Sequence, residues 1–155
     1  MSALTGALLT VAVGCNGLGA GVMLSTVIGI VPLTLALPYD RYVHTIQFLW
    51  PRYDPFMPIT HGITLLADLA LVLVSEGPAR WLFAVAAGLL AVVMAISVVK
   101  NVPVNRYVMA LDPRQQPPDW SRVDPRRRWR AWNLLRTCLA VLALVANAAG
   151  AAALT

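Results

Sequence analysis

Residues 129–147, WRAWNLLRTCLAVLALVAN, place an arginine inside a run that is otherwise apolar enough to lie in a membrane. Steps of three or four residues put six side chains of this run on one helical face: Trp129, Asn133, Arg136, Ala140, Ala143 and Asn147. An ionised side chain in hydrocarbon is costly, and it mostly faces a protein interior where something binds it. We therefore expect this face to point into a helical bundle and to carry a site.

The composition is that of a polytopic membrane protein. Of the 155 residues, 59% are hydrophobic and 12% are charged, and the mean hydropathy is +0.70. Lipid offers no water to a broken backbone, so spanning segments of this kind are expected to be helices. We predict one all-α domain, 1–155, an integral membrane four-helix bundle. Four apolar runs are long enough to span about 30 Å of hydrocarbon, roughly at 7–37, 56–74, 81–99 and 132–154.

The basic residues are concentrated in two of the three connections. Arg41 and Arg52 lie between the first two runs, and most other arginines lie between the last two, whereas the second connection holds Arg80 alone. The positive-inside rule then places the basic loops in the cytoplasm and both termini outside a cell membrane. The net charge of +5 is thus a topology signal and an attraction to anionic lipid. We expect no nucleic-acid partner.

Two connecting segments have expected structures of their own. Residues 39–50 are too short to span, and their apolar side chains share one face, which is typical of an interfacial helix. Residues from about 101 to 128 are rich in proline and charge, which predicts a polar cytoplasmic loop before the last helix. In the first run, Gly17 and Gly21 form a small-residue step. We expect it to pack within the chain, with a homo-oligomer as the alternative.

Polar side chains from several runs are expected to meet near the cytoplasmic boundary. At about 1.5 Å of rise per residue, His61, Asn133 and Arg136 lie within roughly 10 Å of that boundary. Asn101 and Asn105 lie at the boundary itself. Simpler roles are open, because the two asparagines that flank Pro103 could cap a helix and Arg136 could reach lipid phosphate.

Asp68 lies deeper than this group, past the midplane of the membrane. It follows His61 by seven residues, so the two share one helical face. An acid at this depth is expected either to pair with Arg136 or to stay protonated.

The residue pattern predicts no metal site. His44 and His61 lie on different elements, and no CxxC, HExxH or phosphate-binding glycine loop is present. The two histidines could serve as axial ligands of a haem, although no spacing supports that. We predict no tightly bound cofactor, with haem or another metal left open.

A set of short motifs resembles the anthrone oxygenase-like membrane family, also known as domain of unknown function 1772. These are the run from Asn101 to Arg106 (NVPVNR), Leu111-Asp-Pro, Trp120, and Arg128-Trp129 followed by Asn133 and Arg136. The resemblance implies oxidation of polyketide anthrones to anthraquinones without a known metal or flavin. Many relatives have histidine where this chain has Asn133, which leaves His61 as the base.

The implied reaction suits these residue types. The benzylic CH₂ of an anthrone is acidic, so Arg136 with the amides of Asn101, Asn105 and Asn133 would hold the oxyanion. His61 would take the proton. Trp120, Trp129 and Asp68 would bind the planar substrate.

We therefore expect a cofactor-independent monooxygenase that acts on a hydrophobic aromatic small molecule. The alternative is a non-enzymatic membrane protein whose polar pocket on the cytoplasmic side binds a lipid headgroup or a partner.

Overall fold

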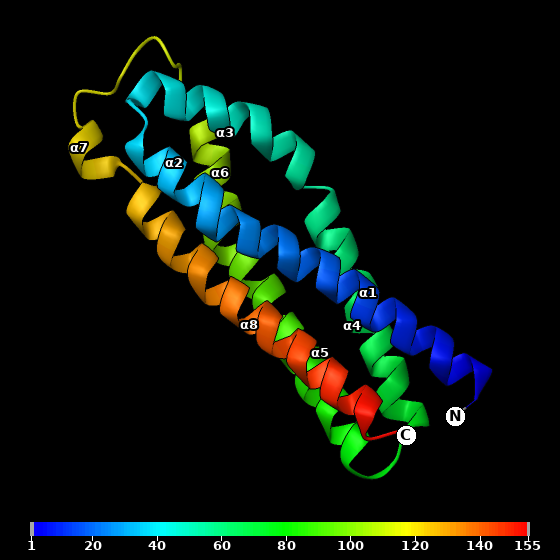
Figure 1. Ribbon diagram of the computed structural model, residues 1–155. Coiled ribbons are helices and arrows are strands. Elements are labelled where there is room, and N and C mark those ends of the chain that lie inside the picture. Colours follow the sequence, from blue (N-terminus) through cyan, green and yellow to red (C-terminus); the bar gives the residue numbers. More distant parts are fainter. Residues whose placement is uncertain (1, 155) are drawn as a thin grey trace.

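The computed structural model describes residues 2–154, and every regular element in that range is helical. Four helical segments run alternately up and down in one bundle (Figure 1), and each is long and apolar enough to cross a membrane. This confirms the predicted all-α membrane bundle. The two termini and the α4–α5 connection lie at one end of the bundle, and α7 and the α2–α3 connection lie at the other.

Each segment contains a break or a change of helical geometry. The first is α1 (Ala3–Ser25), the π-helix η1 (Thr26–Ile30) and α2 (Val31–Ala36). The second is α3 (Tyr39–Tyr53) and α4 (Phe56–Val74). The third is α5 (Gly77–Ile96), the π-helix η2 (Ser97–Asn101) and α6 (Val102–Met109). The last is the short α7 (Trp120–Val123) and the long α8 (Arg126–Ala152).

A π-turn precedes Pro32 and Pro103 and lets each of them lie inside a continuous helical segment. Pro32 follows η1 and Pro103 follows η2. A proline ring clashes with the carbonyl four residues back and offers no N–H. The wider π-turn relieves that conflict by bonding five residues back, as Val31 does to Thr26 and Val102 to Ser97.

The predicted loop from about 101 to 128 is therefore wrong at both ends. The third segment continues through Pro103 to Met109, and α8 already begins at Arg126. Within the predicted loop, 110–119 and 124–125 lie outside helices, and Trp120 lies on α7.

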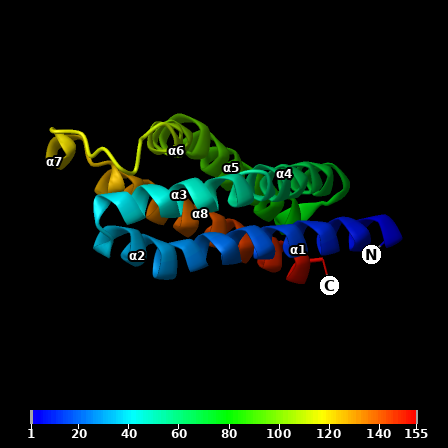
Figure 2. The same cartoon turned by 90° about the horizontal axis from the view of Figure 1, so that it is seen from above.

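α3 forms where an interfacial helix is predicted, and it is three residues longer, ending at Tyr53. Figures 1 and 2 show it beside α2 and pointing in the same direction as α4, so it lengthens the second segment rather than crossing the bundle. Tyr42, Val43 and Ile46 are buried on its inner face and share a core cluster with Val108. α3 thus covers the half of the bundle that lies away from the two termini.

Arg126 fastens the end of α2 to the start of α8. Its Nη1 donates to the carbonyls of Thr34 at 3.1 Å and Leu37 at 2.8 Å, which would otherwise lack partners at a helix end. Asp124 neutralises it through a contact of 2.6 Å to Nη2. The guanidinium also lies 5.2 Å from the ring centre of Tyr42, which ties α3 into the same end of the bundle.

The glycines of α1 do not pack as expected. A Cβ added at Gly17 or Gly21 would meet nothing within 4 Å, so neither glycine faces another helix of the chain. The close approach occurs at Gly19, where an added Cβ would lie 3.3 Å from Oγ1 of Thr60 and 3.4 Å from Nε2 of His61. The inner face of α1 passes through Gly19 and Ala20, whereas Gly17 and Gly21 lie to either side of it. The homo-oligomer alternative remains a prediction.

Candidate functional site

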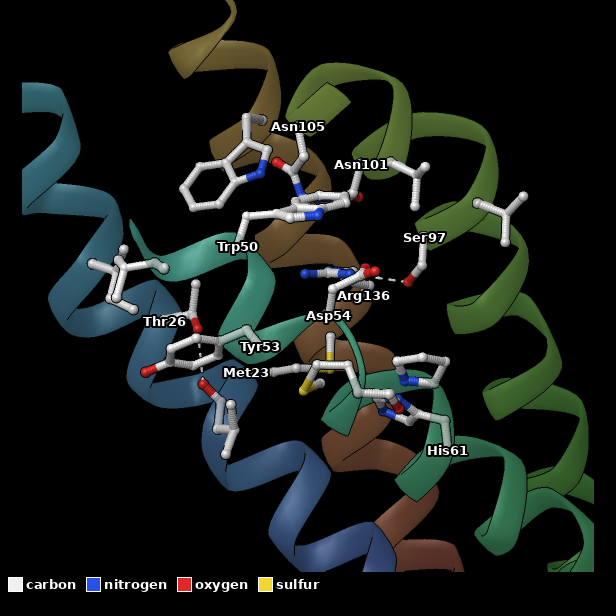
Figure 3. A pocket seen from close by; sticks show the side chains of 18 of the residues that line it. Met23, Thr26, Trp50, Tyr53, Asp54, His61, Ser97, Asn101, Asn105 and Arg136 are labelled. Carbon is white, nitrogen blue, oxygen red and sulfur yellow. Dashed lines mark hydrogen bonds between the residues drawn. The ribbon is translucent and has the colours of Figure 1, made fainter. Parts of the chain in front are cut away.

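A cavity of about 190 Å³ lies among η1, the α3–α4 junction, η2 and α8 (Figure 3). A cavity needs only about 10–15 Å³ to hold one water molecule, so this cavity has room for a small organic molecule. Methionines from three helices form part of its apolar wall, namely Met23, Met57 and Met94. Its polar and aromatic lining consists of Thr26, Trp50, Tyr53, Asp54, His61, Ser97, Asn101, Asn105, Trp129 and Arg136.

Arg136 is held in the cavity by two neighbours. Its Nε and Nη2 donate to Oδ1 of Asn133 at 3.1 and 2.6 Å, and its Nη1 donates to Oγ of Ser97 at 2.9 Å. Asn133 is fixed in turn, because its Nδ2 donates to the Trp129 carbonyl at 2.8 Å.

The guanidinium forms no ion pair among the described residues, although the Asp54 carboxylate lines the same cavity. Between residues 2 and 154, no carboxylate oxygen lies within 4.0 Å of Arg136. The bonds described above use one N–H of each nitrogen, so Nη1 and Nη2 each keep a second N–H. A positive charge that faces a cavity with free donors is suited to an anion.

Asn101 and Asn105 come from the end of η2 and the next helical turn. Figure 3 shows both on one side of Arg136, with His61 on the opposite side. Asn101 is only 2% exposed, and neither its Oδ1 nor its Nδ2 has a hydrogen-bond partner among the described residues. Buried amides are rarely left in this state, so this side chain is available to a ligand.

His61 presents its Nε2 as an acceptor. Its Nδ1 lies 2.8 Å from the carbonyl oxygen of Met57, and a carbonyl can only accept, so Nδ1 carries the hydrogen. In the neutral ring Nε2 then holds a free lone pair. Nothing in the described chain bonds to this nitrogen, and the ring is 4% exposed. The free lone pair of Nε2 is thus sheltered from solvent.

Three aromatic side chains line the cavity. Trp129 is 7% exposed and its Nε1 has no partner among residues 2–154. Trp50 and Tyr53 reach the cavity from α3. Flat rings of this kind pack well against planar ligands.

The anthrone oxygenase family profile matches residues 49–146, from the end of α3 into α8. The chain belongs to the anthrone oxygenase family. The match contains every predicted catalytic residue, whereas the cavity wall formed by α1 and η1 lies outside it. Searches of curated proteins and of solved structures found no match.

For this family member, the structure brings most of the predicted residues to one place and moves others away. Asn101, Asn105, His61, Trp129 and Arg136 line the same cavity. Asn133 does not line it but lies behind Arg136 as its anchor.

Trp120 is not part of the site. It lies on α7 at the end of the bundle, where its ring centre is 4.7 Å from that of Tyr39 and 6.1 Å from that of Tyr42. The loop before α8 carries it to the α3 side, so it packs a structural cluster with Val108.

Asp68 also lies outside the cavity, two helical turns beyond His61. It accepts a hydrogen bond from Nδ2 of Asn147 at 3.4 Å and forms no ion pair with Arg136. The expected alternative of a pair between these two charges is therefore wrong, because the helix separates their levels.

The haem alternative with His44 and His61 as joint ligands also fails. His44 is exposed on α3 and does not line the cavity that contains His61. Among the residues that the structure describes, no group of three or more His, Cys, Asp or Glu side chains is arranged to hold a metal ion.

Sequence reasoning missed Trp50, Tyr53, Asp54 and Ser97. The signal for the first three was present, because positions 50, 53, 54, 57, 58 and 61 recur at helical spacing across the α3–α4 junction. This helical spacing is hard to recognise in the sequence, because the prolines at 51, 55 and 58 predict a break in the helix. Ser97 lies four residues before Asn101 and shares its face.

Proposed function

We propose that this protein is an oxygenase that binds a planar, anthrone-like phenolic substrate, stabilises the anion formed from it and exposes that anion to dioxygen. The observation that carries the proposal is that the unpaired Arg136 guanidinium and the free Nε2 of His61 line one cavity. Membership of the anthrone oxygenase family supports the choice of substrate.

The first step is removal of a proton from carbon. Nε2 of His61 takes a proton from the benzylic CH₂ of the anthrone. The electron pair of the broken C–H bond moves through the ring to the ketone oxygen, which becomes a phenolate-like oxyanion. The central ring becomes aromatic in this step, which makes the carbon acidic enough for an imidazole.

The oxyanion is held by donors that are already in place. The free N–H groups of Arg136 and the amide of Asn101 supply hydrogen bonds inside a cavity with apolar walls, where such donors act strongly. Because Asn133 and Ser97 already fix the guanidinium, little reorganisation is needed when charge develops.

Dioxygen completes the reaction without an external reductant. The electron-rich anion passes an electron to O₂, and the resulting radical pair forms a C–O bond. The peroxide takes the proton back from the His61 imidazolium. Loss of water from the hydroperoxide then gives the quinone carbonyl. One oxygen atom ends in the product and the other in water, and the two remaining electrons come from the substrate.

The walls of the cavity suit such a substrate. Trp50, Tyr53 and Trp129 offer flat faces for a polycyclic ring. The methionine side chains of the apolar wall adapt to ring edges, because thioethers are flexible and polarisable.

The test is an oxidation assay on the purified full chain in detergent. Wild type should accelerate quinone formation and oxygen consumption over the uncatalysed oxidation of an anthrone. Arg136→Gln should remove most of the acceleration, whereas Arg127→Gln, at an exposed position of α8 outside the cavity, should keep it. Failure to accelerate with several anthrones would contradict the proposal.

A second candidate is binding of a phospholipid headgroup. It is favoured by the same free guanidinium, since Arg and amide donors also suit phosphate. In that case phospholipid should co-purify with wild type and be lost from Arg136→Gln, and an anthrone should fail to displace it. Displacement of bound lipid by an anthrone would instead support the oxygenase.

A further inference from the structure

A second group of polar side chains lies deeper in the bundle, apart from the cavity. It consists of Asn16 on α1, Thr64 and Asp68 on α4, and Asn147 on α8, and each is 0% exposed. None of them lines the cavity or takes part in the proposed reaction. We call this group the deep polar cluster.

The register of α1 against α4 brings these residues together. The two helices pack side by side and run in opposite directions (Figure 1). Gly19 lies against His61. Asn16, three residues before Gly19, therefore lies level with Thr64, three residues after His61. Asp68 and its partner Asn147 lie one turn further from the cavity, about 6 Å along the axis.

The deep polar cluster is closed on its far side. An apolar core cluster lies there, which includes Leu9, Ala12, Leu71 and Phe83. The last three of these side chains are fully buried. The side of the cluster that faces away from the cavity is therefore apolar. The groups must find partners among themselves or in something that they bind.

Most of their hydrogen-bonding capacity is unused. Within residues 2–154, Oδ1 and Nδ2 of Asn16, Oδ1 of Asp68 and Oδ1 of Asn147 have no partner. The Thr64 hydroxyl donates to the Thr60 carbonyl at 2.9 Å, which leaves its oxygen free to accept. No basic side chain of the described chain lies within 4.0 Å of Asp68. A buried charge without a partner is costly.

We propose that the deep polar cluster binds one small monovalent cation, sodium, in the middle of the bundle. Amide, hydroxyl and carboxylate oxygens are hard donors, which suit hard cations. A single carboxylate balances a single positive charge, so a divalent ion would leave an excess charge in an apolar surrounding. Protonation of Asp68 would supply a single hydrogen-bond donor, which can satisfy only one of the unpaired oxygens. A bound cation would instead be coordinated by several of these oxygens at once.

This inference does not depend on the proposed oxygenase function. A cation that binds only the folded chain stabilises it by mass action. The site therefore predicts a stability that depends on sodium and on the Asp68 carboxylate, whether or not the cavity binds an anthrone.

The experiment measures the melting temperature of the purified full chain in detergent at mildly alkaline pH. Sodium chloride is compared with choline chloride at equal ionic strength. Once sodium exceeds its dissociation constant about tenfold, the melting temperature should rise by about 4 °C. Asp68→Asn should remove the rise, and the exposed Asp40→Asn on α3 should keep it.

A second variant covers the case in which Asp68→Asn fails to fold. Thr64→Val removes one oxygen with little change of shape, so it should weaken the response to sodium and shift its midpoint to higher concentration. The broadening of the sodium-23 NMR signal by wild type should decrease in parallel. An equal rise with choline, no rise in wild type, or an unchanged response in Asp68→Asn would overturn the proposal, as would a melting temperature that follows pH and ignores sodium.

Discussion

Oδ1 of Asn133 accepts two hydrogen bonds from Arg136, one from Nε at 3.1 Å and one from Nη2 at 2.6 Å. The amide cannot turn away, because its Nδ2 is bonded to the carbonyl of Trp129. Position 133 therefore sets the direction of the guanidinium. Asn133 lies behind Arg136 and outside the cavity. In this structure, position 133 therefore orients the guanidinium and does not present a base to the cavity.

Replacing Asn133 by Leu should weaken anthrone oxidation without removing the charged group. Arg136 would lose its acceptor and rotate, so we expect a loss on the order of tenfold in kcat, less than the loss for removal of a direct oxyanion donor. Steady-state kinetics would measure it, with Leu134→Ala, at an exposed position outside the cavity, as control. Asn133→Asp keeps the acceptor but pairs with the cation, so it should lower kcat by weakening the stabilisation of the developing oxyanion. Equal kinetics for Asn133→Leu and wild type would contradict the positioning role.

Replacing His61 by Phe should abolish proton removal, with a loss of roughly 10²- to 10⁴-fold. The measurement can be made without oxygen, by following exchange of the benzylic hydrogens of an anthrone with deuterium by NMR. Wild type should catalyse this exchange and His61→Phe should not. Normal exchange in the variant would exclude Nε2 of His61 as the base, even if later steps were slowed.

Adding a methyl group at Gly19 should disturb the site, whereas the same change at Gly21 should not. The added Cβ at position 19 would lie 3.4 Å from Nε2 of His61, and the one at position 21 would meet nothing within 4 Å. We expect slower anthrone oxidation for Gly19→Ala and wild-type kinetics for Gly21→Ala. Gly21→Ala should also gain helix stability, by about 0.5–1 kcal/mol. Identical rates for the two variants would argue against contact between α1 and His61 in the working protein.

Gly150→Ala should destabilise the end of the bundle near the termini. A Cβ at this position would lie 2.7 Å from the Phe83 ring, so α8 and α5 would have to separate. Overpacking of this kind costs about 1–3 kcal/mol, which a lowered melting temperature would show. Gly88→Ala, at an open position, is the control. A smaller ring substitute, Phe83→Leu, should restore part of the stability of Gly150→Ala if the clash is the cause.

Labelling of single cysteines would test the predicted sidedness. Gln116 and Glu76 are exposed in connections at opposite ends of the bundle. From the Lys/Arg distribution, a cysteine at 116 should be protected from an impermeant reagent in intact cells, and one at 76 should react. The reverse pattern would invert the topology, leaving the fold unchanged.

The sequence alone determined the number of spanning segments and the inner face of α8. The length of an apolar run predicts a membrane span, because the thickness of the hydrocarbon core sets the number of residues that a spanning helix needs. The face from Trp129 to Asn147 followed from helical periodicity, which does not depend on neighbouring helices. The asparagines and alanines of this face are buried, as expected for a face that points into the bundle.

Only the tertiary structure decided which polar groups meet. Asn101 enters the cavity because η2 carries the helix through Pro103, and a π-turn changes the face on which later residues lie. Asp68 and His61 share a face of α4, yet only His61 lines the cavity, because Asp68 lies two helical turns further along α4. Trp120 lies outside the predicted site because its ring packs against Tyr39 and Tyr42 of α3. These contacts join residues far apart in the chain, so local periodicity carries no information about them.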